Sequence, residues 1–356
     1  MNYRILVINP GSTSTKIAIY EGETPVYAET IRHAPADLAP FPGVLDQLDY
    51  RKELILRALD KACYRLSDLD GISARGGFTK PVTAGTYTVD EDVVAAMHHP
   101  VHEHASNLGT LLAWELKKAC PEKDIPAFFV DPVSVDEITD VARVTGFAGI
   151  ERQSFFHALN HRGMARVAAA RLGKKYEDCD LVVCHLGGGI TSAAHHHGRA
   201  VEVCNIFEEG CFSMDRPGGL PVHAVVDLCF SGRSKEDIVR QLDTASGVVS
   251  YLGTQDFREV EEMAFDKQDP KARRIFDALA YQLAKDIGAL SAVLSFHVDA
   301  IVLTGGMAYS QRFTDAVSAY VKSIAPIIVL PGESEMLSLC QGALRVLSGE
   351  ETAKKF

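Results

Sequence analysis

The chain has 356 residues, with a hydrophobic fraction of 47%, a charged fraction of 23% and a formal net charge of −11. This length allows about two domains, and the composition is typical of a globular protein. The acidic balance argues against a nucleic-acid partner, because binding a phosphate backbone requires clustered Lys and Arg. No apolar run approaches the roughly 20 residues that cross a bilayer, and the N-terminus lacks a signal-peptide pattern. We therefore expect a cytoplasmic protein without a membrane or nucleic-acid partner.

Two segments in different halves of the chain share one design. Each has an apolar, β-branched strand, a turn of small residues and a second strand. The first covers residues 4–20 and turns at 9–15; the second covers 180–194 and turns at 187–189. Strand composition on both sides of a short turn is typical of a β-hairpin. The sequence therefore predicts two similar domains, each beginning with a hairpin.

The remaining segments alternate helical patterns with further strands. Apolar residues recur at helical spacing in residues 51–66, 107–119, 157–172 and 311–324, and a last helix is expected at 335–348. The helical segment 270–294 has a centre too apolar all round for a surface helix, so we expect it to be buried between the domains. Strands are expected at 300–304, before the pair Gly305-Gly306, and at 327–330. Strands interleaved with helices indicate the α/β class.

The first turn, Asn9–Lys16, has the groups that a phosphate needs. Small residues expose backbone N–H groups, the hydroxyls of residues 12–15 add donors, and Lys16 adds positive charge. It is not a Walker-type loop, because a strand follows it. For the same reason Gly187–Gly189 is not a dinucleotide fingerprint. The alternative for the first turn is a solvent-exposed hairpin rich in turn-forming residues.

These two turns and the third turn at Gly305 and Gly306 resemble the acetate kinase, hexokinase, Hsp70 and actin superfamily. The resemblance implies two similar domains, each a mixed β-sheet flanked by helices, with an active-site cleft between them. One domain is expected at 1–150 together with the C-terminal helix 335–356, and the nucleotide-binding domain at 151–334. The first two turns are then expected to hold nucleotide phosphates, and the third to bound the nucleoside.

Further segments narrow the resemblance to the acetokinase family. These are Asn9-Pro-Gly-Ser-Thr-Ser-Thr-Lys16, Phe156-His157 with His161, His185-Leu-Gly-Gly-Gly189, Arg216-Pro-Gly-Gly219, Asp256-Phe-Arg258 and Gly332–Leu339. Four other segments are similar to the butyrate kinases within that family: Ala74-Arg-Gly-Gly77, Gly85-Thr-Tyr87, His104–Gly109 and Phe212–Pro221. One departure concerns the substrate-binding Arg that acetate kinases carry three residues before a His-Gly-Gly. Here Ile72 stands in place of that Arg, and Arg75 in place of the His.

The resemblance implies a reversible, in-line transfer of the ATP γ-phosphoryl group to butyrate or a related short-chain fatty acid. It assigns catalysis to His157, Arg216 and Asp131, and binding of the acid to Arg75, His104 and Phe156. It assigns nucleotide binding to Ser12, Ser14, Lys16, His185, Gly187, Gly188, Gly189, Asp256, Phe257, Arg258, Gly305 and Gly306. It places Mg²⁺ at Asn9 and Glu335, with Glu333 as the competing carboxylate. Family members form homo-oligomers, so we expect at least a dimer.

Several alternatives stay open at this point. The acid could be acetate, propionate or a branched-chain acid, because one methylene in an apolar pocket changes binding by only about 1–3 kcal/mol. Other functions are a sugar kinase, or a non-enzymatic ATP-switched clamp or activator. Single residues also have purely structural readings: Asp131 can cap a turn, Arg216 can face solvent, His157 can be a core histidine, and Glu335 can favour a helix start.

Histidine and cysteine patterns give no independent site. His98, His99, His102 and His104 crowd one stretch and residues 195–197 form a histidine run, but neither has the spacing of a fourth zinc ligand. Pro100 also interrupts any helix face in the first stretch. The eight Cys form no CxxC pair, so we expect neither a structural metal nor a disulfide framework.

Overall fold

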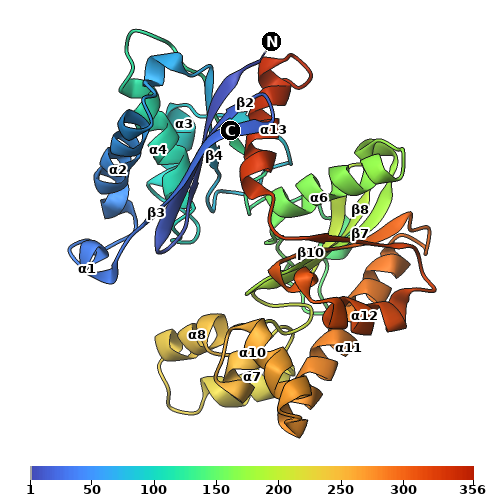
Figure 1. Ribbon diagram of the computed structural model, residues 1–356. Coiled ribbons are helices and arrows are strands. Elements are labelled where there is room, and N and C mark those ends of the chain that lie inside the picture. Colours follow the sequence, from blue (N-terminus) through green and yellow to red (C-terminus); the bar gives the residue numbers. More distant parts are fainter. Residues whose placement is uncertain (1) are drawn as a thin grey trace. The chain divides into compact units, whose positions relative to one another are not determined.

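The computed structural model describes residues 2–356, which form two compact units (Figure 1). The first unit comprises the chain up to Asp136 together with Ala158–Asn160 and Ser334–Phe356. The second comprises Glu137–His157 and His161–Glu333. The boundaries expected from the sequence, after residues 150 and 334, stay a prediction about separately folding domains.

The first unit has a six-stranded sheet with the order β3-β2-β1-β4-β6-β5. Its strands are β1 (Arg4–Pro10), β2 (Ser14–Glu21), β3 (Thr24–Arg32), β4 (Gly71–Arg75), β5 (Thr86–Thr88) and β6 (Ala127–Val130). The β1–β2 hairpin and β3 are antiparallel, whereas β1, β4 and β6 run parallel, and β5 is antiparallel to β6. The sheet is therefore mixed.

Helices cover both faces of this sheet, because successive strand residues point to opposite faces. In β1, Leu6 and Ile8 pack with α2 and α4, whereas Ile5 and Val7 pack with α13. The helices of the unit are α1 (Pro35–Leu38), α2 (Leu48–Lys61), α3 (Glu91–Met97), α4 (Asn107–Lys118) and α13 (Glu335–Leu347). The last helix of the chain thus completes the unit that the first strand begins.

The second unit has a five-stranded sheet with the order β11-β10-β7-β8-β9. Its strands are β7 (Asp180–Leu186), β8 (Ile190–His196), β9 (Arg199–Val203), β10 (Ala300–Gly305) and β11 (Ile327–Pro331). The β7–β8 hairpin and β9 are antiparallel, and β7, β10 and β11 run parallel. Taken in the reverse direction, the order β9-β8-β7-β10-β11 corresponds to β3-β2-β1-β4-β6 of the first sheet. The two units therefore share a sheet topology.

Alternate residues of β7 again enter separate cores. Val182 and Cys184 pack with α11 and α12, whereas Leu181 and Val183 pack with α6. The helices are α5 (Asp140–Arg143), α6 (Ala158–Arg171, whose first three residues belong to the first unit), α7 (Val222–Cys229), α8 (Lys235–Thr244), α9 (Gly247–Leu252), α10 (Phe257–Glu261), α11 (Pro270–Val293) and α12 (Gln311–Val321). Two mixed sheets flanked by helices confirm the predicted fold class.

The long helix α11 corrects one expectation. Leu279, Leu283 and Ile287 fill the core of the second unit, but Tyr281 is 51% exposed and Val293 is 48% exposed. The prediction of a helix buried on all sides is therefore wrong, because an Ala- and Tyr-containing outer face has a high apolar content without being covered.

Among residues 2–356 no helix has the length and apolar character to span a membrane. All eight cysteines are free.

Candidate active site

The second unit brings two of the three predicted turns together. His185 lies near the end of β7, and Gly187–Gly189 connect β7 to β8, with the Gly187 N–H donating to the Gly189 carbonyl at 3.2 Å. Gly305, at the end of β10, has φ +90°, and a Cβ there would lie 2.5 Å from the Leu186 carbonyl oxygen. Only glycine allows this approach. The third turn therefore lies directly against the end of β7, with Gly306 exposed beside it.

Arg216 lies against the same glycine turn. A Cβ on Gly189 would come within 2.4 Å of an Arg216 guanidinium nitrogen, and the Met214 N–H donates to the Gly188 carbonyl at 3.0 Å. The guanidinium carbon lies 5.3 Å from the Phe207 ring centroid. Within residues 2–356 this guanidinium has no carboxylate partner, and its buried Nε has no hydrogen-bond partner. A partly buried guanidinium that forms no ion pair among the described residues and lies beside a glycine turn is suited to an anionic ligand.

His157 immediately precedes α6 and stacks on His185, with ring centroids 4.0 Å apart. Its Nδ1 lies 2.9 Å from the Thr191 hydroxyl on β8. The same hydroxyl lies 2.9 Å from His161 Nε2, one turn further along α6. Thr191 therefore connects His157, just before α6, to His161 within α6, and Nε2 of His157 is the nitrogen that Thr191 does not contact.

The hydrogen-bonded chain continues into the core. His161 Nδ1 lies 3.4 Å from His195 Nε2, and His195 Nδ1 lies 2.7 Å from the Tyr176 hydroxyl. Burial lowers the pKa of His195 to about 3 and holds the pKa of His161 well below its usual value, so both rings are neutral near pH 7. In a neutral chain each ring has one donor and one acceptor nitrogen, so the direction in which the Thr191 hydroxyl donates sets the tautomers of the rings that follow it.

The β1–β2 turn of the first unit has a different support. The Gly11 N–H donates to the Ser14 carbonyl at 2.7 Å, which closes the turn. Beneath it, the guanidinium of Arg51 from α2 donates to the Gly11 carbonyl at 2.8 Å and to the Ser12 carbonyl at 3.2 Å. Arg51 is only 1% exposed, and burial lowers its pKa to about 10. Ser12 and Lys16 are exposed and Ser14 is partly exposed, so these predicted phosphate-binding side chains are accessible.

A second cluster in the first unit joins one residue each from β1, β4 and α13. The Asn9 amide nitrogen donates to the Glu335 carboxylate at 2.7 Å, although 326 positions separate the two residues. The Arg75 guanidinium donates to Asn9 Oδ1 at 3.4 Å and to Glu335 Oε2 at 3.4 Å. Glu333 belongs to the second unit and lies 3.8 Å from His185 Nε2. Within the first unit the structure therefore joins Asn9 to Glu335.

Other predicted residues have more local surroundings. Asp131 has φ +38°, and its carboxylate accepts from the Gly85 N–H at 2.7 Å. A left-handed Asp next to a strand end is strained backbone of the kind that often occurs at functional sites. His104 Nδ1 lies 2.9 Å from the Ser106 hydroxyl at the start of α4. Phe156 is buried edge-on to the His161 ring, with centroids 5.1 Å apart.

The segment expected at the adenosine begins α10. Asp256 caps the helix by accepting from the Arg258 N–H at 2.9 Å, and it pairs with the Arg258 side chain at 2.6 Å. Phe257 lies in the aromatic core with Phe276 and Phe313. Its predicted nucleotide contact stays a prediction. The exposed Arg258 is the member of this segment with the most accessible side chain.

Sequence reasoning missed two residues that the structure ties to the predicted site. Arg51 was only one charged position of an amphipathic helix, and its buried position is visible only when α2 is placed beneath the turn. Thr191 was only a small residue at the start of a strand. The first six residues of β8 are all buried, so no alternation in this strand singles out Thr191.

Comparison with protein families decides the identity. The model that describes the acetokinase family matches residues 143–324, which is slightly more than half of the chain. The chain belongs to the acetokinase family. It is therefore an enzyme of a family of ATP-dependent carboxylate kinases, which argues against a non-enzymatic clamp or activator.

Solved structures give the same fold for this acetokinase. Acetate kinase from Porphyromonas gingivalis matches with a TM-score of 0.78 and 19% identity, covering 97% of this chain and 100% of that one. A propionate kinase from Francisella tularensis matches with a TM-score of 0.75 and 17% identity, covering 96% and 98%. Acetate kinase from Entamoeba histolytica matches with a TM-score of 0.76 and 16% identity, covering 96% and 99%. At these identities the likeness shows the acetate kinase fold and not the acid used.

Proposed function

We propose that this acetokinase transfers the γ-phosphoryl group of ATP to butyrate, reversibly and in line, to give butyryl phosphate and ADP. The observation that carries the phosphoryl-transfer part is the arrangement in the second unit. There a glycine turn, the stacked pair His157–His185 and the cation Arg216, for which the described residues provide no ion pair, lie together. This set supplies hydrogen-bond donors and positive charge to an anion, which is what a loose phosphoryl transition state needs.

The proposed roles follow from these contacts. Arg216 donates to the oxygens of the transferring phosphoryl group, because no carboxylate of residues 2–356 competes for its guanidinium. In the proposal the Thr191 hydroxyl donates to Nδ1 of His157, so that Nε2 carries the ring proton and donates to the phosphoryl group. The backbone N–H groups of Gly187–Gly189, the His185 ring and the β1–β2 turn with Ser12, Ser14 and Lys16 bind nucleotide phosphates. A substrate carboxylate is already ionised near pH 7, so the reaction needs no strong general base.

The family's divalent metal fits one cluster of the first unit. Asn9 and Glu335 present an amide and a carboxylate, which are the hard oxygen ligands that Mg²⁺ prefers, often through water. In the proposal these two residues hold Mg²⁺, which neutralises charge on the nucleotide phosphates when bound. Asp131 and Arg75 organise the surroundings of this cluster, and Arg75 already bonds both members.

The choice of butyrate rests on the segments that resemble butyrate kinases. The structure packs two of them together: a Cβ on Gly77 would lie 2.2 Å from the Asn107 amide oxygen, and a Cβ on Gly109 would lie 2.2 Å from the Arg75 carbonyl oxygen. Phe78 lies next to His104, with ring centroids 5.6 Å apart. The proposal places the acid at Arg75, His104 and Phe156. Adenosine is assigned to Asp256, Phe257, Arg258, Gly305 and Gly306.

A hydroxamate assay for acyl phosphate tests the proposal, with ATP, Mg²⁺ and straight-chain acids from acetate to valerate plus isobutyrate. We expect the highest kcat/KM with butyrate. An identical preparation of Arg216→Ala controls for acid kinases of the expression host. A maximum at acetate or propionate would overturn the proposed substrate and leave the kinase. Activity on none of the acids, with glucose phosphorylated instead, would overturn the function.

A further inference from the structure

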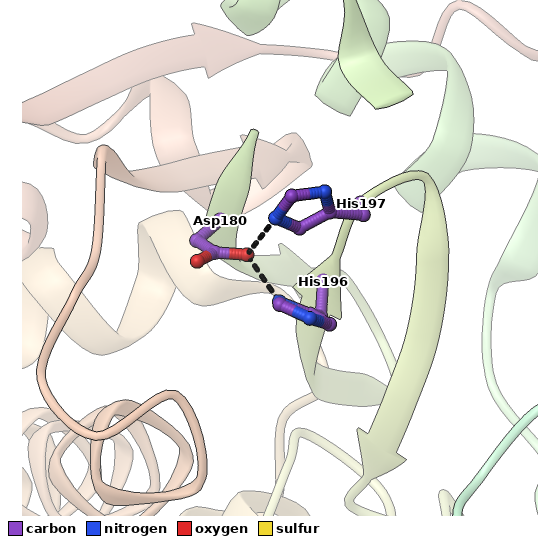
Figure 2. Close-up of side chains that lie close together, drawn as sticks. All are labelled: Asp180, His196 and His197. Atoms are coloured by element: carbon purple, nitrogen blue, oxygen red, sulfur yellow. Dashed lines mark hydrogen bonds and ion pairs between the residues drawn. The ribbon is translucent and has the colours of Figure 1, made fainter. Parts of the chain in front are cut away.

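Three potential metal ligands meet at one end of the β7–β8 hairpin, and Figure 2 shows their side chains pointing toward one another. Nδ1 of His196 lies 2.6 Å from Oδ1 of Asp180, and Nε2 of His197 lies 4.0 Å from the same oxygen. All three ligand atoms lie within 4.8 Å of one another. Among residues 2–356, no other group of three His, Cys, Asp or Glu side chains meets this description.

The local backbone explains how two consecutive histidines share a side. Asp180 and His196 are directly paired in the β7–β8 ladder. Successive residues of a strand point to opposite faces, so His197 would normally point away from Asp180. His197 instead has φ +48°, a left-handed conformation at the turn before β9. This conformation is uncommon for a residue with a Cβ, and here it brings the second imidazole back toward the carboxylate.

We propose that Asp180, His196 and His197 form a binding site for a divalent transition-metal ion such as Zn²⁺, separate from the proposed Mg²⁺ cluster. Two imidazoles and one carboxylate are ligands that Zn²⁺ accepts and Mg²⁺ does not favour. Tetrahedral zinc with bonds near 2.1 Å separates its ligand atoms by roughly 3.4 Å, and the observed separations bracket this value. His196 and His197 side chains are 53% and 59% exposed, so water completes the coordination.

The surrounding charge is also favourable to a cation. The Asp299 carboxylate accepts from the Asp180 N–H at 3.0 Å, which places a second carboxylate beside the three ligands. Lys174 neutralises part of this charge, through an ion pair with Asp299 at 2.5 Å. The bound ion would join the start of β7 to the β8–β9 turn, at the end of the hairpin away from Gly187–Gly189. Its effect is therefore on the stability of the second unit.

The test is calorimetric titration of chelator-treated protein with Zn²⁺ at about pH 7.5, without nucleotide or Mg²⁺, together with thermal unfolding. We expect one saturable site and a Tm that rises with Zn²⁺. His196→Ala/His197→Ala should abolish both the binding and the Tm shift. His98→Ala/His99→Ala is the matched control, because it removes another exposed pair of adjacent histidines and should change neither.

Asp180→Asn separates a true three-ligand site from a bare histidine pair. We expect its Zn²⁺ affinity to fall at least 10-fold, because a carboxylate ligand is replaced by a neutral amide. Equal Zn²⁺ affinity in the wild type and in either Asp180→Asn or His196→Ala/His197→Ala would overturn the proposal, as would binding of Mg²⁺ in place of Zn²⁺. Absence of any saturable binding to the wild type would also overturn it. All these readouts are independent of kinase activity.

Discussion

The β1–β2 turn and the β7–β8 turn occupy equivalent places in two sheets of the same strand order, yet they use different chemistry. The first turn exposes hydroxyls and Lys16, and the buried Arg51 bonds its carbonyls from beneath. The second turn consists of Gly187–Gly189, with histidines and Arg216 packed around it. The first turn supplies polar groups from its own side chains. The second turn consists of glycines, which have no side chains, so polar groups from other segments can approach its backbone. One backbone design therefore presents two different sets of groups for the phosphate contacts that we propose.

The largest effect is expected from the second turn. Replacing Arg216 by Ala should lower kcat for acyl phosphate formation by about 100- to 1,000-fold, the usual loss when one donor to a developing anion is removed. ATP affinity, measured by calorimetry, should change much less. Arg240→Ala is the control, since Arg240 is an exposed cation paired with Asp237. A near-normal kcat in Arg216→Ala would show that another cation acts on the phosphoryl group.

The first turn should respond through stability. Arg51→Ala leaves several carbonyl oxygens and the Gln47 side chain without their donor, and we expect the free energy of unfolding to fall by roughly 3 kcal/mol. Arg57→Ala on the same helix removes only an exposed pair with Glu53, which should cost less than about 0.5 kcal/mol. Urea unfolding measures both. Equal losses for the two variants would contradict the proposed support of the turn by Arg51.

Acid should destabilise both regions, because each contains a buried neutral histidine. Burial lowers the pKa of His33, which bonds Thr15 beside the first turn, to about 4, and that of His195 to about 3. Below about pH 6.5 the unfolded chain binds more protons than the folded one. The free energy of unfolding therefore decreases as the pH is lowered. The loss continues to about pH 4 for His33 and to about pH 3 for His195.

Urea unfolding at about pH 7, 6 and 5 measures this dependence, which is at most about 1.4 kcal/mol per pH unit for each group. His195→Gln should flatten the slope, whereas His223→Gln, at an exposed position of α7, should leave it unchanged. Identical slopes in the wild type and His195→Gln would show that His195 is not held neutral by the fold.

The smallest effect is expected at Thr191. Thr191→Val keeps the shape but removes the hydroxyl between His157 and His161, and we expect kcat to fall about 10-fold. Thr191→Ser should restore most of the rate. Nitrogen NMR of the His157 ring in the free protein provides a readout without turnover: the ring should lose its single tautomer in Thr191→Val. An unchanged spectrum and rate would contradict a positioning role for Thr191.

The parts of the fold that sequence reasoning predicted were those with strong local periodicity. Both hairpins, strand β10 and helix α13 follow from alternation or helical spacing within one short segment. The exposed face of α11 was not predicted, because apolar content alone does not show which side of a helix is covered. The positions of Arg51 and Thr191 depend on packing between elements, so no local pattern contains them.

The candidate site shows the same limit. Resemblance paired Asn9 with Glu335, and the structure joins them across 326 positions, which neither residue's neighbourhood would indicate. The sequence predicts no metal site at the histidine run 195–197, because the carboxylate that lies beside it belongs to another strand. Asp180 is 16 positions from His196 in sequence and directly opposite it in the ladder. Contacts across a sheet are set by strand register, which composition does not reveal.

Helix α13 has a consequence for synthesis on the ribosome. Ile5 and Val7 of β1 share a core with Leu339 and Ala343, and the Lys354 N–H donates to the Thr86 carbonyl at 2.8 Å. The side of β1 that packs against α13 therefore lacks this helix until residues 335–347 have been made, which is after the continuous stretch 161–333 of the second unit. During translation the second unit can fold before α13 joins the first sheet, and until then this apolar side of β1 is open to non-native contacts.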